Sequence, residues 1–370
     1  MDQFGFEEWL SGLNGLTAAQ RGRVFRELAL ADAAESGDDV GGVDLAARPA
    51  ALVENGTDGT VASGLGGRSS SRARDDTGSR DDLLEEVGRR RIARSGCLHC
   101  GSDRVTCWGR AHGSPRYRCS DCRKTFNPFT KTPVSGLHKK ERWADQARAL
   151  IEGETLARAA ARCEVHPSTA FRWRHRFLAA LVGDKPGSLT GIVEADETFV
   201  LESFKGRRRG LPRPARERAG KAEKRGLSAE QIPVIVARDR SGATFDAVLP
   251  RLDAASLQEA LGDRIAPSTD FCCDGGKAIT AYARRAKLAL HVLPAPGNPD
   301  PSEPRFHINN VNAYHSRLKE WMRRFHGVAT ENLPNYLSWR RTLEALPKTA
   351  GVDRWIMAAV GLGPYQQNLQ

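Results

Sequence analysis

The sequence predicts an α/β protein with a mixed sheet, preceded by a small metal-binding module and a helix-turn-helix. Three patterns in its 370 residues lead to this prediction. Four cysteines follow a C-x2-C-x18-C-x2-C spacing, and two short helical patterns come after them with a tight turn between. The C-terminal half begins with strand patterns and then alternates strands with helices, which is typical of an α/β layer.

The N-terminal third divides into two segments. Residues 1–34 show apolar residues at helical spacing and are interpreted as an amphipathic helical segment. Residues 35–84 are rich in Gly, Ser, Ala, Asp and Arg, and offer too little apolar surface to offset the entropy of ordering. We interpret this second segment as a flexible linker.

The cysteine pattern predicts a zinc ribbon over residues 85–135. "CLHC" and "CSDC" each place two thiolates on one tight turn, and the residues between them are long enough for a hairpin. Such a site is structural, because four protein ligands leave no open position on Zn²⁺. The alternative is four unrelated buried cysteines. The predicted zinc ligands are Cys97, Cys100, Cys119 and Cys122.

Residues 136–185 predict a helix-turn-helix DNA-binding domain. "TLARAAAR" forms a short helix, a turn follows at residues 163–165, and a second helix opens at "HPST". The alternative is a generic helical hairpin. The second helix would place four side chains outward for phosphate and base contacts, namely Ser168, Thr169, Arg172 and Arg176.

Residues 186–345 predict the α/β domain, with 346–370 as a C-terminal tail. Strand patterns occupy 191–200, 232–239, 242–249, 268–274 and 288–293, and helical patterns occupy 254–261, 276–287 and 310–325.

Two acidic residues at strand positions suggest a catalytic site in this domain. Asp196 lies in "GIVEADETFV", where Glu194 shares its face and Glu197 points to the other face. Asp274 follows an apolar strand and precedes two glycines. Two such carboxylates on neighbouring strands could hold a pair of magnesium ions roughly 4 Å apart for phosphoryl transfer. For either acid alone, a helix cap or a solvated strand end is the simpler interpretation.

These motifs together resemble bacterial insertion-sequence transposases of the ISXO type, the fifteen-ninety-five family. The resemblance is carried by the cysteine pattern, the helix-turn-helix, "VEADETFV", "CCDGG" and "HINNVNAYHSRLKEWMRRFHGVATENLPNYLSWRR". It implies an RNase H-like catalytic domain with Mg²⁺ or Mn²⁺. It also implies cutting and strand transfer at the terminal inverted repeats, and a homo-oligomer in the synaptic complex with target DNA.

The resemblance assigns the first two catalytic acids to Asp196 and Asp274. The third position, Glu in many DDE transposases, falls on Asn312, and a downstream basic residue falls on Lys319. An amide oxygen can still bind magnesium but adds no charge. If Asn312 is only a surface residue of its helix, Glu194 and Glu303 are the next candidates for a third ligand.

The charge distribution points to nucleic acid as the partner. Lys and Arg number 56 against 45 Asp and Glu, a net charge of +11, and residues 205–225 contribute ten basic and two acidic residues. We interpret 203–226 as a basic loop that clamps DNA phosphates, with a solvated surface as the alternative. Its representatives are Arg207, Arg208 and Arg209.

Two further expectations follow from the whole chain. No apolar run is long enough to cross a bilayer and no secretion signal opens the chain, so we expect a cytoplasmic, nucleoid-associated protein without a membrane partner. Two other functions are compatible with the motifs: a transposase-derived DNA-binding regulator that does not cut, and a DNA endonuclease without strand transfer.

Overall fold

The computed structural model describes residues 75–365 except 208, 215, 217–219, 221, 224–227 and 294–302, with side chains from residue 82 onward. The predicted helical segment at 1–34 and Arg208 lie outside the described residues, as does most of the predicted linker. Among the described helices, none is long and apolar enough to cross a membrane.

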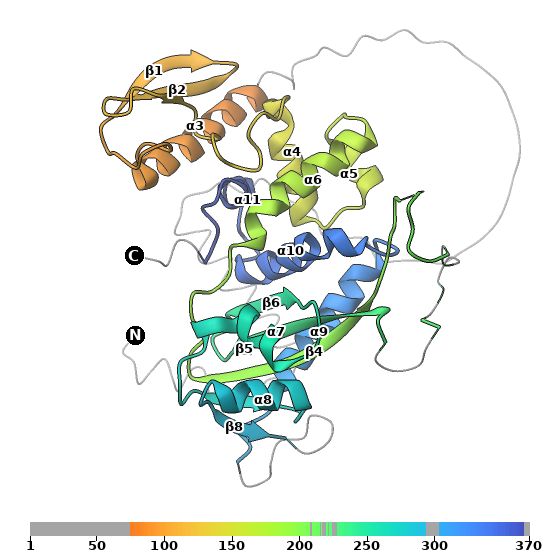
Figure 1. Cartoon of the computed structure of the whole chain (residues 1–370). Coiled ribbons are helices and arrows are strands. Elements are labelled where there is room, and N and C mark those ends of the chain that lie inside the picture. The colour runs from red at the N-terminus through yellow and green to blue at the C-terminus, as the bar shows by residue number, and fades with distance from the viewer. Residues whose placement is uncertain are drawn as a thin grey trace, which may run out of the picture. The chain divides into compact units, whose positions relative to one another are not determined.

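A helix and a small sheet form the first part (Figure 1). The helix α3 spans Asp75–Ser95, so the predicted linker boundary at 84 is wrong, as is the start of the ribbon at 85. Its buried residues Leu84 and Val87 supply the apolar face that a linker would lack. Three antiparallel strands follow, β1 (Val105–Ala111), β2 (Ser114–Cys119) and β3 (Thr125–Phe126).

Three helices form the predicted helix-turn-helix region. They are α4 (Trp143–Ile151), α5 (Leu156–Arg162) and α6 (Pro167–Val182). Pro167 opens α6, where its missing N–H costs no hydrogen bond. The ring of His166 accepts a hydrogen bond from the Ser168 N–H and so caps the same helix. The turn between α5 and α6 lies where the sequence predicted it.

The C-terminal half contains a five-stranded mixed sheet, as predicted. Its strands are β4 (Ile192–Leu201), β5 (Gln231–Asp239), β6 (Thr244–Val248), β7 (Asp270–Cys273) and β8 (Ala289–Val292). The spatial order is β6-β5-β4-β7-β8, with β4, β5 and β6 antiparallel and β4, β7 and β8 parallel. This is the RNase H-like arrangement that the resemblance implied.

Helices cover both faces of this sheet (Figure 1). On one face, α7 (Ala254–Leu261) and α8 (Lys277–Arg285) pack on Val193, Ala195 and Ile235. On the other, α9 (Asn309–Arg323) and α10 (Leu333–Ala345) share a core with Val234 and Val236. The alternation of buried residues along β4 and β5 therefore separates two apolar cores.

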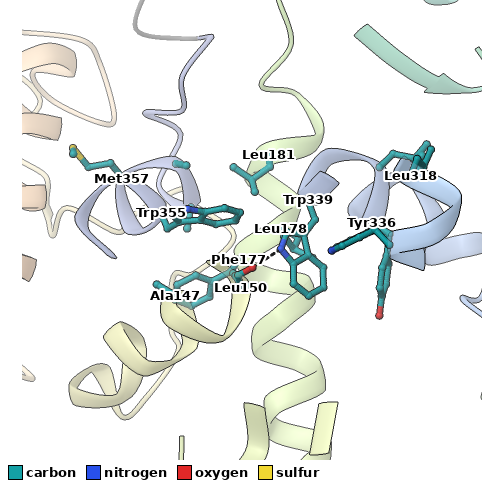
Figure 2. Close-up of a cluster of buried hydrophobic side chains, with 14 of the residues drawn as sticks. Ala147, Leu150, Phe177, Leu178, Leu181, Leu318, Tyr336, Trp339, Trp355 and Met357 are labelled. Carbon is teal, nitrogen blue, oxygen red and sulfur yellow. Dashed lines mark hydrogen bonds between the residues drawn. The ribbon is translucent and has the colours of Figure 1, made fainter. Parts of the chain in front are cut away.

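The second core continues from the sheet into the helix-turn-helix. Helix α10 packs against α6, and the indole N–H of Trp339 donates to the Leu150 carbonyl at 2.8 Å (Figure 2). The predicted tail at 346–370 is wrong, because α11 (Val352–Ala359) packs against α4 and α6. Its buried residues Trp355, Ile356 and Met357 make this docking favourable. The helix-turn-helix and the sheet thus share one apolar interior.

Candidate active site

The four predicted zinc ligands come together at one end of the small sheet. The sulfur atoms of Cys97 and Cys122 are 3.6 Å apart, those of Cys100 and Cys119 are 3.7 Å apart, and all four lie within 4.8 Å of one another. Tetrahedral Zn²⁺ with Zn–S bonds of about 2.3 Å requires sulfur separations of about 3.8 Å. Backbone N–H groups of Cys122 and Asp121 lower the pKa of the Cys119 thiol to about 6, which favours the thiolate. The donor set therefore fits zinc.

A second cluster lies where β4 and β7 approach each other, and it joins the two predicted catalytic acids. Strand β4 pairs with β7 in parallel, with Glu194 opposite Cys272, so Asp196 lies beside the end of β7 and the residue after it, Asp274. Carboxylate oxygens of Asp196, Asp274 and Glu197 all lie within 4.8 Å of one another. Such an all-oxygen group suits Mg²⁺ or Mn²⁺.

Glycines make room for this cluster. Gly275 has φ +87°, and a Cβ there would come within 2.8 Å of Val292 on β8. A Cβ on Gly276 would lie 3.4 Å from oxygens of both Asp274 and Glu197. The Gly276 N–H donates to Asp274 at 3.0 Å and holds that carboxylate beside the start of α8.

Glu197 is the member of this cluster that the sequence did not single out. It does extend from the face of β4 opposite Asp196, as predicted, yet its carboxylate still reaches Asp274 beyond the strand end. Burial, together with the charges of Asp274 and Asp196, raises the pKa of Glu197 to about 7. One of its oxygens is buried and makes no hydrogen bond with the described residues. The available signal was its position next to Asp196.

Helix α9 brings its polar side to the same place. The buried His315 places Nδ1 3.4 Å from a carboxylate oxygen of Asp196. Asn312 is half-buried one turn earlier on the same face, and its side chain makes no hydrogen bond with the described residues. A direct role of Asn312 as a ligand stays a prediction.

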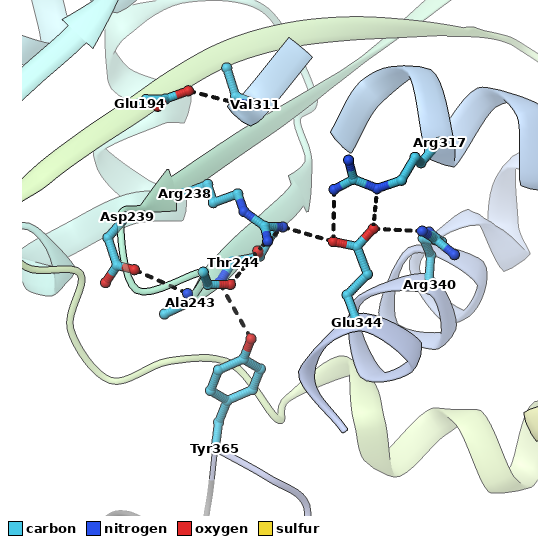
Figure 3. Close-up of polar contacts among 11 residues, drawn as sticks. Glu194, Arg238, Asp239, Ala243, Thr244, Val311, Arg317, Arg340, Glu344 and Tyr365 are labelled. Carbon is cyan, nitrogen blue, oxygen red and sulfur yellow. Dashed lines mark hydrogen bonds and ion pairs between the residues drawn. The ribbon is translucent and has the colours of Figure 1, made fainter. Parts of the chain in front are cut away.

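Glu194, predicted as an alternative third metal ligand, has a structural role instead. Its side chain is fully buried and accepts hydrogen bonds from the Asn310 and Val311 N–H groups at 2.8 and 3.0 Å. It also pairs with Arg240 at 2.8 Å. This carboxylate fixes the first turn of α9 on β4 (Figure 3), so it is not a third metal ligand. Glu303 is exposed, pairs with Arg305, and is not part of the acidic cluster.

A cavity of about 970 Å³ opens further along β4. Its walls are the end of β4, the loop that begins at Glu202, and the C-terminal half of α9, including the exposed Lys319. The Lys205 ammonium donates to three carbonyls just past α9, those of residues 325, 326 and 327, at 2.9, 3.2 and 2.9 Å. The start of the basic loop is thereby fixed to this helix.

The predicted loop cations differ in their availability. Arg207 is exposed and has only a 3.6 Å ion pair with the exposed Glu331, and Arg209 is exposed. Arg213 pairs with Glu202 at 3.3 Å, and Arg216 pairs with Glu230, so these two stabilise the loop base. The described cations Arg207 and Arg209 remain accessible to an anionic partner.

The outward residues of α6 are mostly placed as predicted. Ser168 and Arg172 are exposed and Thr169 is half-buried. Arg176 is also exposed, but its guanidinium donates to the carbonyls of Pro133 and Ser135, so it holds the preceding segment instead. The structure adds Phe171 to this surface.

The sheet domain and the helix-turn-helix both match known protein families. Residues 188–341 match the ISXO2-like transposase domain, and residues 137–182, which contain α4 to α6, match a homeodomain-like domain. A protein of Halobacterium salinarum described as an uncharacterized protein in transposable element ISH50 is 30% identical over 246 residues, covering 65% of this chain and 82% of that relative. The crystal structure of a pre-cleavage Mos1 transpososome aligns with a TM-score of 0.23 and 14% identity, over 61% of this chain and 77% of the other.

Proposed function

The chain belongs to the ISXO2-like transposase family, and from that premise we propose that it is the transposase of an insertion sequence. It binds the terminal inverted repeats of its element, then cuts the DNA and transfers the strand to target DNA as a homo-oligomer. The observation that supports this best is the acidic cluster. Asp196 and Asp274, distant in sequence, meet with Glu197 beside the end of β7, close to the helix that bears the remaining family positions.

The residues divide the work of phosphoryl transfer. Asp196 and Asp274 would hold the divalent cation, which when bound activates the attacking oxygen and stabilises the leaving oxygen. His315, whose Nδ1 lies 3.4 Å from an Asp196 oxygen, would help to orient that carboxylate. Lys319 projects from the same helix face toward the cavity, where its ammonium would engage a DNA phosphate.

Binding of DNA is assigned to three surfaces. Helix α6 would enter the major groove, the ribbon would support the same duplex, and the basic loop would contact phosphates near the acids. Arg207 and Arg209 are the described loop residues suited to this contact.

The test replaces each acid by its amide. Asp196→Asn and Asp274→Asn should each reduce Mg²⁺-dependent cutting of element ends more than about 100-fold, because loss of outer-shell partners alone costs 10- to 100-fold. The affinity of each variant for the same ends should stay within about twofold of the parent's affinity, since neither acid lies in α6 or the ribbon. The matched control is Asp270→Asn on β7, whose carboxylate pairs with His291 at 2.8 Å outside the cluster.

The same assay separates the alternatives. Cutting at the parent rate by either amide variant would overturn the assignment of the acids. Binding without cutting by the parent protein would favour a DNA-binding regulator. Cutting without joining of the cleaved end to a target duplex would favour an endonuclease.

A further inference from the structure

Helix α6 presents a largely exposed face on the side away from its buried residues. Its buried side includes Ala170, Trp173 and Phe177, which pack into the common core. The opposite side carries residues at steps of three and four, the spacing by which a homeodomain recognition helix places its base contacts. These are the exposed Ser168, Phe171 and Arg172, and the half-buried His175.

Phe171 is the unusual member of this face. Its side chain is 42% exposed, and among the described residues only Trp108 and Val292 are other large apolar side chains left exposed. A single exposed apolar residue is common by itself. At this position, however, it lies in the first half of the helix that would enter the major groove, where recognition helices contact bases.

The ring of Phe171 is also held in place. Its centroid lies 4.4 Å from that of His175, and the His175 Nδ1 pairs with the Asn335 side chain of α10 at 2.8 Å. Burial, and then the charge of Arg174, lowers the pKa of His175 to about 4, so this support is uncharged at neutral pH. The contact continues to Tyr336, which belongs to the common core. Phe171 is therefore an exposed aromatic side chain that rests on a residue packed against the common core.

The neighbours of Phe171 indicate the partner. Arg172 is exposed and makes no ion pair or hydrogen bond with the described residues. An exposed arginine next to an exposed phenylalanine on a recognition helix suits the major groove, where Arg binds guanine and apolar side chains contact the thymine methyl group. We propose that Phe171 recognises a thymine of the terminal repeat by contacting its 5-methyl group. This inference rests on the proposed function.

The test removes only that methyl group. Duplexes enriched by the full chain from a random-sequence pool would be resynthesised with deoxyuridine at one thymine position at a time. The parent protein should lose about three- to tenfold in affinity at one position, in line with the loss of one buried methyl. Phe171→Ala should bind the thymine duplex as weakly as the parent binds the uracil duplex. Replacing that thymine by uracil should not weaken its binding further. Phe171→Leu, which keeps an apolar contact, should still respond.

Arg172→Ala is the matched control on the same face. It should weaken binding to the thymine and uracil duplexes by the same factor, and thermal unfolding should show all three variants folded. The inference is overturned if no thymine position responds, if Phe171→Ala still responds, or if Phe171→Ala loses as much affinity for single strands as for the duplex, which would indicate stacking. If the chain enriches no sequence at all, the proposed function itself fails.

Discussion

At the scale of single residues, neighbouring acids on β4 serve separate purposes. Glu194 is completely surrounded by donors at the start of α9, whereas Asp196 and Glu197 face Asp274 with few partners of their own. Because like charges so close together repel, a divalent cation would stabilise the second group, and the first has no need of one. Position within the sheet, and not residue type, separates a structural carboxylate from a candidate ligand.

The third ligand can be identified by direct binding of Mn²⁺, followed by electron paramagnetic resonance. We expect Asn312→Ala to weaken Mn²⁺ binding and to reduce cutting strongly, with the fold unchanged because Asn312 lies off the buried stripe of α9. Glu197→Gln should also weaken binding, since it removes one of three clustered carboxylates.

Glu320→Gln, an exposed site on α9 paired only with Arg323, controls for loss of one negative charge. Parent-like Mn²⁺ affinity in Asn312→Ala together with weakened affinity in Glu197→Gln would transfer the third position to Glu197. Parent-like Mn²⁺ affinity in both variants would show that neither Asn312 nor Glu197 is a metal ligand.

At the scale of elements, the zinc ribbon is the part with the least core of its own. Its buried apolar cluster contains only Cys97, Cys119 and Phe126, and two of these are predicted ligands. Apolar burial of this size cannot offset the entropy of ordering such a module, so we expect a bound zinc ion to supply the difference.

Cys100→Ser should therefore abolish zinc binding and unfold the ribbon locally. The measurements are zinc content and limited proteolysis, which should show new cleavage within residues 97–126 and little elsewhere. Cys107→Ser is the matched control, because Cys107 is exposed on β1 outside the cluster. A Cys100→Ser protein that keeps its zinc, or resists protease like the parent, would contradict the four-cysteine site.

At the scale of the whole described chain, the helix-turn-helix and the sheet share one core, and α10 makes polar contacts with both. Glu344 of α10 binds Arg317 of α9 at 2.8 and 3.0 Å and Arg238 of β5 at 2.8 Å, with Arg340 beside them (Figure 3). Deeper in, the buried Arg341 binds the Leu181 carbonyl of α6 at 2.7 Å. Because α10 links both modules, we expect them to unfold in one cooperative transition.

Glu344→Gln tests these polar contacts through their pH dependence. Burial alone would raise the pKa of Glu344, but Arg317, Arg238 and Arg340 outweigh it and lower the pKa from 4.5 to about 2. Because the pKa of Glu344 is lower in the folded than in the unfolded state, its ionised carboxylate stabilises the folded protein above about pH 4.5. This contribution disappears as the pH falls toward 2. The gap between the two pKa values corresponds to a contribution on the order of 3 kcal/mol to the free energy of unfolding.

Denaturant unfolding should thus show Glu344→Gln less stable than the parent at pH 7, with a smaller difference near pH 3. Glu331→Gln, whose exposed carboxylate pairs with Arg207 alone among the described residues, should have little effect at either pH. Equal destabilisation by Glu344→Gln at both pH values would contradict the charge-based account, and separate unfolding of the two modules would contradict the shared core.

Local sequence patterns determined most elements of this protein, though not α3 and α11, and the tertiary structure decided which of them meet. The cysteine spacing, the alternation in β4 and the stripe of α9 depend on neighbours a few residues apart, so they could be predicted directly. The approach of Glu197 to Asp274, the capping of α9 by Glu194 and the docking of α11 depend on strand register and on packing between distant segments. No local pattern encodes those contacts, because their free energy exists only once the core has formed.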